Sequence, residues 1–180
     1  MKKLKGTKTF ENLTNALIGE SLGAIKYLFF ASKAKKDGYV EIANFFEETS
    51  KNEKEHAKVW FKLLNGGSIP LTTKNLESSF KGELLEGKKT YKEMSNVAKK
   101  EGFNEIAKLF EMTARIEYNH GIRFQQLLKN IKSKKVFSSP SSVKWICLNC
   151  GNIEVGRNAP IKCPVCNHKR DYYKKFVKSY

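Results

Sequence analysis

The stretches Glu53-Lys54-Glu55-His56 and Glu117-Tyr118-Asn119-His120 each place a glutamate three residues before a histidine. Residues i and i+3 of a helix share one face, so each stretch directs a carboxylate and an imidazole to the same side. Both pairs fall on apolar stripes of helical period, where a charge is costly unless it is paired, protonated or bound to a cation. The two stretches therefore predict metal ligands inside a helical core.

Four long segments have apolar residues at the spacing of a helix that faces a core. The connections between them contain glycine, as in Asp37-Gly38 and Glu101-Gly102, and glycine suits the turn after a helix C-terminus. The expected helices cover about residues 10–36, 40–64, 73–100 and 104–131. Four amphipathic helices joined by short connections predict a four-helix bundle.

Further carboxylates interrupt the same stripes, and they extend the two pairs to a larger set. The acidic and imidazole groups on or beside the stripes are Glu20, Glu53, His56, Glu83, Glu86, Glu117 and His120. Carboxylates that converge in one core repel each other unless cations lie between them. Such a set is too large for one ion, and its oxygen-rich character suits iron or manganese better than structural zinc. We therefore expect a dinuclear site of the kind found in ferritin-like bundles.

A second metal site is expected near the C-terminus, in two Cys-x-x-Cys pairs. The polar, non-periodic residues 133–142 are the expected linker between a helical domain, 1–132, and a small domain, 143–180. The four sulfur ligands are Cys147, Cys150, Cys163 and Cys166. They suit tetrahedral binding of zinc or of a single iron. The expected aromatic core of the small domain consists of Trp145, Tyr172, Tyr173 and Phe176.

The formal net charge of +16 raises the alternative of a nucleic-acid-binding protein with a zinc ribbon. The lysines are spread along the whole chain, however, and no RNP, helix-turn-helix or zinc-finger pattern accompanies them. A lysine-coated face exposed to solvent is the favoured interpretation, and such a basic surface could also help to attract an acidic redox partner. No secretory or membrane-spanning stretch is evident, so we expect a cytoplasmic protein with no membrane or nucleic-acid partner.

The order of these motifs resembles the rubrerythrin family over nearly the whole chain. The segments that carry the resemblance are Gly19-Glu20-Ser21, Gly82-Glu83-Leu84-Leu85-Glu86, Glu117-x-x-His120 and the CLNCG and CPVC cysteine motifs. The resemblance implies a mainly α protein, in which a ferritin-like four-helix bundle with two carboxylate-bridged irons precedes a rubredoxin-like domain. That domain would hold one iron on its four cysteines, which favours iron over zinc.

The resemblance also implies a role for each ligand of the di-iron site. Glu53 and Glu117 are the expected bridging carboxylates. Glu20 is the expected terminal ligand of one iron, and Glu83 with His120 would complete the other.

Four residues are expected to take part in catalysis. By the same resemblance, Glu86 and His56 exchange on the first iron as its oxidation state changes, while Tyr27 and Tyr91 hydrogen-bond around the site.

The activity implied by the resemblance is that of a non-haem di-iron peroxidase, which reduces hydrogen peroxide to water and protects an anaerobe or microaerophile from oxidative stress. Electrons would enter at the rubredoxin-like iron and pass to the di-iron site. Their expected donor is an external protein, either rubredoxin or a separate NADH-dependent reductase, and the expected assembly is a homodimer. A ferritin-like ferroxidase or iron-storage protein remains the alternative.

Overall fold

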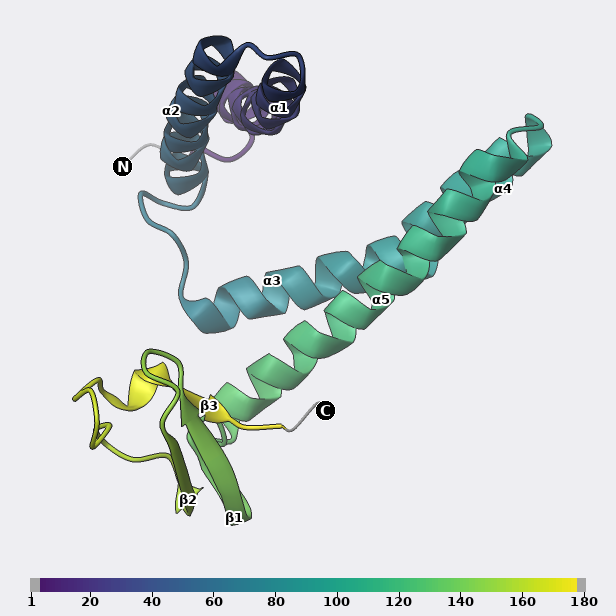
Figure 1. Ribbon diagram of the computed structural model, residues 1–180. Helices are drawn as coiled ribbons and strands as arrows, with labels where there is room; N and C mark the ends of the chain where they lie inside the picture. The colour runs from purple at the N-terminus through teal and green to yellow at the C-terminus, as the bar shows by residue number, and fades with distance from the viewer. Residues whose placement is uncertain (1–3, 178–180) are drawn as a thin grey trace. The chain divides into compact units, whose positions relative to one another are not determined.

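The computed structural model describes residues 4–177 (Figure 1). The chain divides into two compact units, the first ending at Pro70 and the second beginning at Leu71. Each unit contains one hairpin of long helices, and the second also contains a small sheet. None of the helices in the described part of the chain combines the length and apolar character that a bilayer crossing requires.

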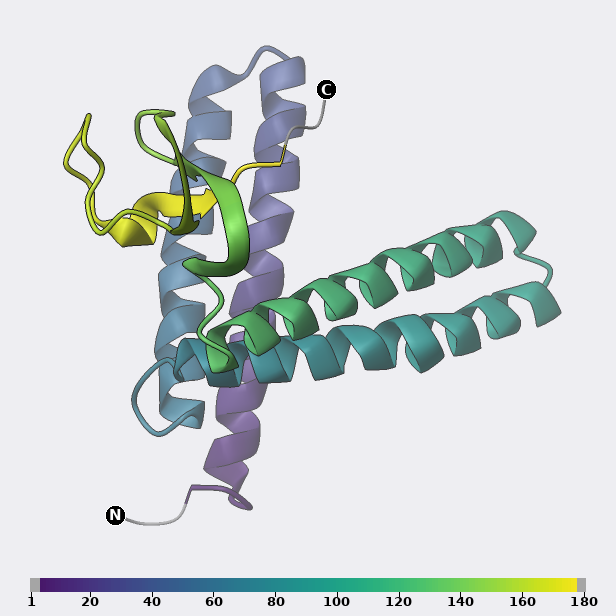
Figure 2. The same ribbon diagram turned by 90° about the horizontal axis from the view of Figure 1, so that it is seen from below.

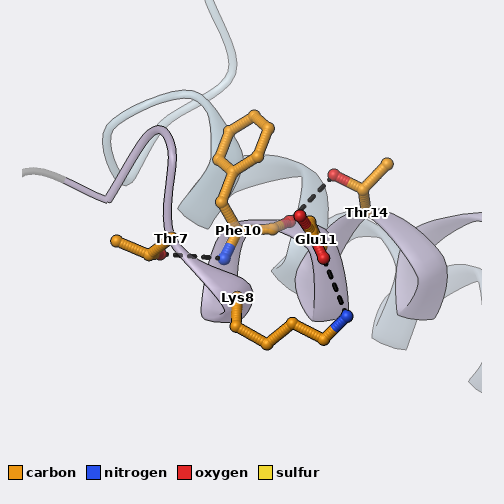
Figure 3. Close-up of polar contacts among 5 residues, drawn as sticks. All are labelled: Thr7, Lys8, Phe10, Glu11 and Thr14. Atoms are coloured by element: carbon orange, nitrogen blue, oxygen red, sulfur yellow. Dashed lines mark hydrogen bonds and ion pairs between the residues drawn. The ribbon is translucent and has the colours of Figure 1, made fainter.

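The first unit is a hairpin of α1 (Lys8–Lys36) and α2 (Val40–Leu64), which lie side by side in Figures 1 and 2. Thr7 caps the start of α1, because its hydroxyl oxygen accepts a hydrogen bond of 3.2 Å from the backbone N–H of Phe10 (Figure 3). Lys8 and Glu11 form an ion pair of 2.8 Å in the same turn. At the other end Gly38, with φ of +85°, makes the turn into α2.

Small side chains pack α1 against α2. The buried positions of the hairpin are Ala24, Ala31, Ala34, Ala43, Ser50 and Ala57. Side chains of this size let two helix backbones approach closely, and the buried hydroxyl of Ser50 donates a 2.7 Å hydrogen bond to the carbonyl oxygen of Ala24. Large apolar side chains such as Ile42 and Phe45 are 50% and 68% exposed. The predicted apolar stripe of the second segment is therefore not the face that closes the hairpin.

The second hairpin pairs a long interrupted helix with α5 (Asn104–Lys132). The interrupted helix consists of α3 (Thr72–Leu85), a π turn η1 (Glu86–Thr90) and α4 (Tyr91–Lys100). The sequence predicted one regular helix here, and the π turn is a difference from that prediction. At this turn the two helices meet closely, since a Cβ added to Gly87 would lie 2.6 Å from the backbone nitrogen of Tyr118.

The two hairpins repeat each other in detail. Lys35 pairs with Glu47 at 2.5 Å in the first hairpin, and Lys99 pairs with Glu111 at 2.5 Å in the second. The turns correspond as well, with Gly102 in the second hairpin at φ of +86°. The molecule therefore contains an internal repeat of one helical hairpin, which periodicity alone did not reveal.

The C-terminal part folds around a small sheet of strand order β2-β1-β3. Its strands are β1 (Ser138–Cys147), β2 (Ile153–Asn158) and β3 (Tyr173–Lys175), and the short 3-10 turn η2 (Arg170–Tyr172) precedes β3. The start of β1 lies within the range expected to be a linker. Only Ser138 pairs there, with Asn158, and regular pairing resumes at Val143.

Two of the four expected aromatic residues form the core of this domain. Trp145 and Tyr173 are buried together with Cys147 and Cys163. Trp145 also donates a 2.9 Å hydrogen bond from Nε1 to the carbonyl oxygen of Gly156. Tyr172, in contrast, is 44% exposed. The mainly helical chain with a small four-cysteine C-terminal domain confirms the predicted fold class.

Candidate metal centres

The first hairpin brings Glu20 of α1 together with Glu53 and His56 of α2. Nδ1 of His56 lies 3.3 Å from Oε2 of Glu53 and 3.5 Å from Oε2 of Glu20. A hydrogen bond with Glu53 is the main cause that lowers the pKa of Glu20, and the nearby imidazole acts in the same direction against desolvation. This first triad keeps its α1 carboxylate in the charged form that binds a cation.

The second hairpin brings Glu83 of α3 together with Glu117 and His120 of α5. Nδ1 of His120 lies 2.8 Å from Oε2 of Glu117 and 3.5 Å from Oε2 of Glu83. Burial, followed by the neighbouring carboxylate of Glu117, raises the pKa of Glu83. Oε2 of Glu83 is buried, and within residues 4–177 it makes no hydrogen bond of ordinary geometry. A buried carboxylate oxygen without a donor is where a cation would be accommodated.

Both triads fit a metal ion by geometry and by donor type. In each, one ligand atom from every residue lies within 4.8 Å of the others. Two carboxylates and one imidazole suit iron or manganese better than a structural zinc. The structure thus groups six of the seven predicted helical ligands, three on each hairpin.

Glu86, the seventh predicted ligand, lies exposed on the π turn and belongs to neither triad. Its charge nevertheless contributes to the raised pKa of Glu83. The internal repeat explains its position. Gly19-Glu20-Ser21-Leu22-Gly23 corresponds to Gly82-Glu83-Leu84-Leu85-Glu86-Gly87, and a tyrosine follows the last glycine by four residues in both segments.

The segment of the second hairpin is therefore one residue longer than that of the first, and the additional residue is Glu86. A single extra residue in a helix is accommodated by a wide i→i+5 turn, and such π turns occur often at functional sites. Aligning the two halves of the sequence would have revealed this insertion. Its role as a ligand stays a prediction.

The two predicted tyrosines occupy equivalent places in the hairpins. Tyr27 stacks on Phe46 and Tyr91 packs on Phe110, with ring centroids 6.0 Å apart in each pair. A Cβ added to Gly23 would lie 3.7 Å from Cγ of Glu53 and 3.9 Å from Cε2 of Tyr27. Tyr27 thus lies beside the first triad, while the hydrogen-bonding roles of both tyrosines stay predictions.

The four cysteines converge as predicted. Sγ of Cys147 lies 3.6 Å from that of Cys166, and Sγ of Cys150 lies 3.6 Å from that of Cys163. A tetrahedral metal with bonds of about 2.3 Å to sulfur requires separations of about 3.8 Å, so the arrangement fits such an ion.

Two similar turns hold these cysteines in place. Gly151, with φ of +78°, donates to the carbonyl oxygen of Cys147 at 2.9 Å. Asn167, with φ of +61°, donates to that of Cys163 at 3.0 Å. A backbone turn thus holds the two cysteines of each Cys-x-x-Cys pair close together.

The electrostatics of the sulfurs are unequal. The backbone N–H of His168 is the main cause that lowers the pKa of Cys166 to about 5. The N–H of Asn152 acts similarly on Cys150, but the other thiols and burial outweigh it and raise that pKa to about 12. Without a metal the four sulfurs cannot all ionise together, and a bound cation removes this conflict.

The chain resembles known proteins over nearly its whole length. A family model described as Rubrerythrin matches residues 11–71 and 74–149, and one described as Rubrerythrin, rubredoxin-like domain, matches residues 145–174. The rubrerythrin of Clostridium perfringens is 42% identical over 195 aligned residues, which cover 100% of both chains. That of Nitratidesulfovibrio vulgaris is 39% identical, with 96% of each chain covered. A solved structure of nigerythrin in a partially reduced state is 27% identical, covers 94% of this chain and 87% of its own, and has a TM-score of 0.36.

The cofactors follow from the family models and from the residues present. The carboxylate and histidine residues of a bridged two-iron site are in place, and the four cysteines form a rubredoxin-like site for one iron. Two relatives of 42% and 39% identity match over all or nearly all of their length, and a family model covers most of the chain. This chain therefore belongs to the rubrerythrin family.

Proposed function

We propose that this protein is a peroxidase that reduces hydrogen peroxide to water and serves in defence against oxidative stress. The family is one of oxidoreductases that react with peroxide and take electrons from partner proteins. The observation that carries the proposal is the pair of triads, each with two carboxylates and one imidazole, in a chain that also holds a four-cysteine site.

The reaction consumes two electrons and two protons for each peroxide, and both oxygen atoms leave as water. Each triad would hold one iron, and two ferrous ions would supply the two electrons that the reaction consumes. Glu53 and Glu117 carry the histidine-linked carboxylates of the two triads, and we assign them as ligands that would hold the irons. Each triad has the ligands for one of the two ions.

The protons enter through side chains on the surface of the hairpin. Glu86 is exposed and lies one helical turn from Glu83, so it connects solvent with the second triad. A carboxylate in this position can deliver protons to the departing oxygen atoms and exchange with solvent between turnovers. We also assign His56, whose side chain is 57% exposed, and Glu86 as ligands that would exchange when the oxidation state of the metal changes.

Electrons enter at the four-cysteine site. The backbone hydrogen bonds of both Cys-x-x-Cys turns keep the sulfur atoms fixed, so little reorganisation accompanies electron transfer. We assign the donor as an external protein, a rubredoxin or an NADH-dependent reductase, and the functional unit as a homodimer.

The test is a single-turnover experiment with iron at all sites. Reduced protein mixed with hydrogen peroxide should reoxidise rapidly, with two electrons lost per peroxide and water as the product. The matched variants are Glu53→Ala, which removes a triad carboxylate, and Glu55→Ala, which removes one that pairs with Lys58 instead. Slow reoxidation, accompanied by net uptake and mineralisation of ferrous iron, would contradict the proposal and favour the iron-storage alternative.

A further inference from the structure

The side chain of Tyr173 carries a buried polar atom that neither the fold nor the proposed function explains. Tyr173 begins β3 and is 3% exposed, in the cluster that also contains Cys147, Cys163 and Trp145. Its hydroxyl oxygen is buried and makes no hydrogen bond of ordinary geometry with any atom of residues 4–177. Burying a hydroxyl in this way costs free energy unless a partner is supplied.

The group beside this hydroxyl is the sulfur of Cys163. Tyr173 and Cys163 are both buried in one cluster, at 3% and 0% exposure, and the hydroxyl interacts with this sulfur. A donor placed against a thiol stabilises its thiolate form.

A second neighbour leaves the hydroxyl proton free for the sulfur. The side-chain amide of Asn152 also approaches the hydroxyl, where one of its N–H groups can donate to the hydroxyl oxygen. The same amide donates to Oε1 of Glu154 at 2.9 Å. With Asn152 acting as a donor, the hydroxyl oxygen can accept from the amide while its own proton points elsewhere.

The backbone fixes Tyr173 in this position. Cys147 and Tyr173 are paired across β1 and β3, and the N–H of Leu148 donates to the carbonyl oxygen of Tyr172 at 2.7 Å. The backbone of Tyr173 is thus paired with the strand that carries Cys147, while its hydroxyl lies beside Cys163.

We propose that Tyr173 donates an O–H···S hydrogen bond to the sulfur of Cys163 when iron occupies the four-cysteine site, and that this bond raises the reduction potential of that iron. A thiolate accepts such a bond, whereas a thiol competes as a donor. Reduction adds negative charge to the iron and its sulfurs, so a donor to sulfur stabilises the reduced state more than the oxidised state. Tyr173 is therefore a positioning and tuning residue that does not contact peroxide.

The experiment is a redox titration of the full-length, iron-loaded protein, followed by the visible thiolate-to-iron absorption. In Tyr173→Phe the ring remains and only the hydroxyl is lost. We expect its reduction equilibrium to shift toward the oxidised state by about threefold to tenfold, which is about 28 to 59 mV for one electron. The absorption bands should move to longer wavelength, because loss of the hydrogen bond raises the energy of the sulfur electrons.

Tyr172→Phe is the matched control. Tyr172 precedes Tyr173, is largely exposed, and packs against His168 with ring centroids 4.4 Å apart. Its loss of a hydroxyl should leave both the potential and the spectrum unchanged. If the two variants behave alike, Tyr173 does not act on the sulfur and the proposal is wrong.

A second substitution covers the case in which Tyr173→Phe fails to bind iron. Incorporation of 3-fluorotyrosine at position 173 retains the ring and hydroxyl but makes the hydroxyl a stronger donor. The potential should then rise above that of the unmodified protein, and an unchanged or lower value would overturn the proposal. None of these readouts uses peroxide, so they are independent of the proposed peroxidase activity.

Discussion

Glu20 and Glu83 occupy equivalent positions in the two helical hairpins, yet their pKa values move in opposite directions. A hydrogen bond with Glu53 lowers the pKa of Glu20, whereas burial and the carboxylate of Glu117 raise that of Glu83. The charge of Glu86, which has no counterpart in the first hairpin, adds to the second effect. The two triads therefore have the same donor types but different electrostatic environments.

The raised pKa of Glu83 predicts how pH changes the stability of the metal-free protein. A carboxyl whose pKa is raised by folding stabilises the fold below its unfolded value, and this contribution is lost as pH rises through the folded value. We expect Glu83→Gln to increase the free energy of unfolding of the metal-free protein at pH 7, with the gain disappearing in acid. Denaturant titrations across pH measure this.

Glu77→Gln on the same helix is the control of opposite sign. Lys81 lowers the pKa of Glu77, so this carboxylate stabilises the fold above its unfolded value. Its removal should slightly destabilise the protein at pH 7 and have no effect in acid. If both variants shift stability in the same direction at pH 7, the assigned electrostatics are wrong.

Loss of Glu117 should abolish turnover without disturbing the four-cysteine site. We expect Glu117→Ala to reduce peroxide consumption by at least about a hundredfold, in line with the effect of removing a ligand or its orienting partner. The iron content should fall while the iron–thiolate absorption remains. Glu105→Ala on the same helix removes only an exposed pair with Lys108, and it should retain full activity. Equal activity in both variants would refute the assignment of Glu117 to the metal site.

The extra residue of the second hairpin can be tested by deletion. Removing Glu86 should convert the π turn into a regular α-helical turn and strongly reduce peroxide turnover. Glu86→Gln should also lose activity but retain the π turn, because it keeps the number of residues. Crystal structures of the two variants distinguish these outcomes. A π turn that persists after the deletion would show that the inserted residue does not cause it.

The close approach of α5 to the π turn predicts a strong requirement for glycine at position 87. A Cβ there would lie 2.6 Å from the Tyr118 backbone nitrogen and 2.7 Å from the Ala114 carbonyl oxygen, so backbone must move. We expect Gly87→Ala to destabilise the protein by about 3 kcal/mol. Gly82→Ala meets nothing within 4 Å and should stabilise it by roughly 0.5–1 kcal/mol. Denaturant unfolding measures both, and a neutral Gly87→Ala would contradict the packing.

The unequal sulfurs predict the order of alkylation in the metal-free protein. The thiolate is the reactive form, and Cys166, with a pKa of about 5, is ionised at pH 7 whereas Cys150, at about 12, is not. Iodoacetamide should therefore modify Cys166 first, although Cys150 is the more exposed of the two. Peptide mass spectrometry after short exposure measures the order. Faster modification of Cys150 would show that exposure outweighs ionisation.

Much of the fold could be predicted because local signals are strong. The second helix begins and ends where predicted, at Val40 and Leu64, since glycine-containing turns enclose it. Helical spacing also placed Glu53 with His56 and Glu117 with His120, and the cysteine spacing fixed the sulfur site.

Other features lay beyond periodicity. The apolar spacing did not distinguish a face of small residues such as Ala31 and Ala43, which closes the hairpin, from a face of large ones such as Phe45. The insertion of Glu86 was also missed, because a π turn restores the helical phase after one extra residue. The sequence also could not show that the hydroxyl of Tyr173, the group that distinguishes it from phenylalanine, is buried without an ordinary hydrogen bond among residues 4–177.

The likeness of the two hairpins has an evolutionary consequence. A gene for a single hairpin, once duplicated in tandem, would encode two identical sets of ligands and hence two equivalent metal positions. Insertion of one codon, that of Glu86, is then sufficient to give the second copy its wide turn and additional carboxylate. A step this small would have turned a symmetric ancestor into a protein whose two metal positions differ.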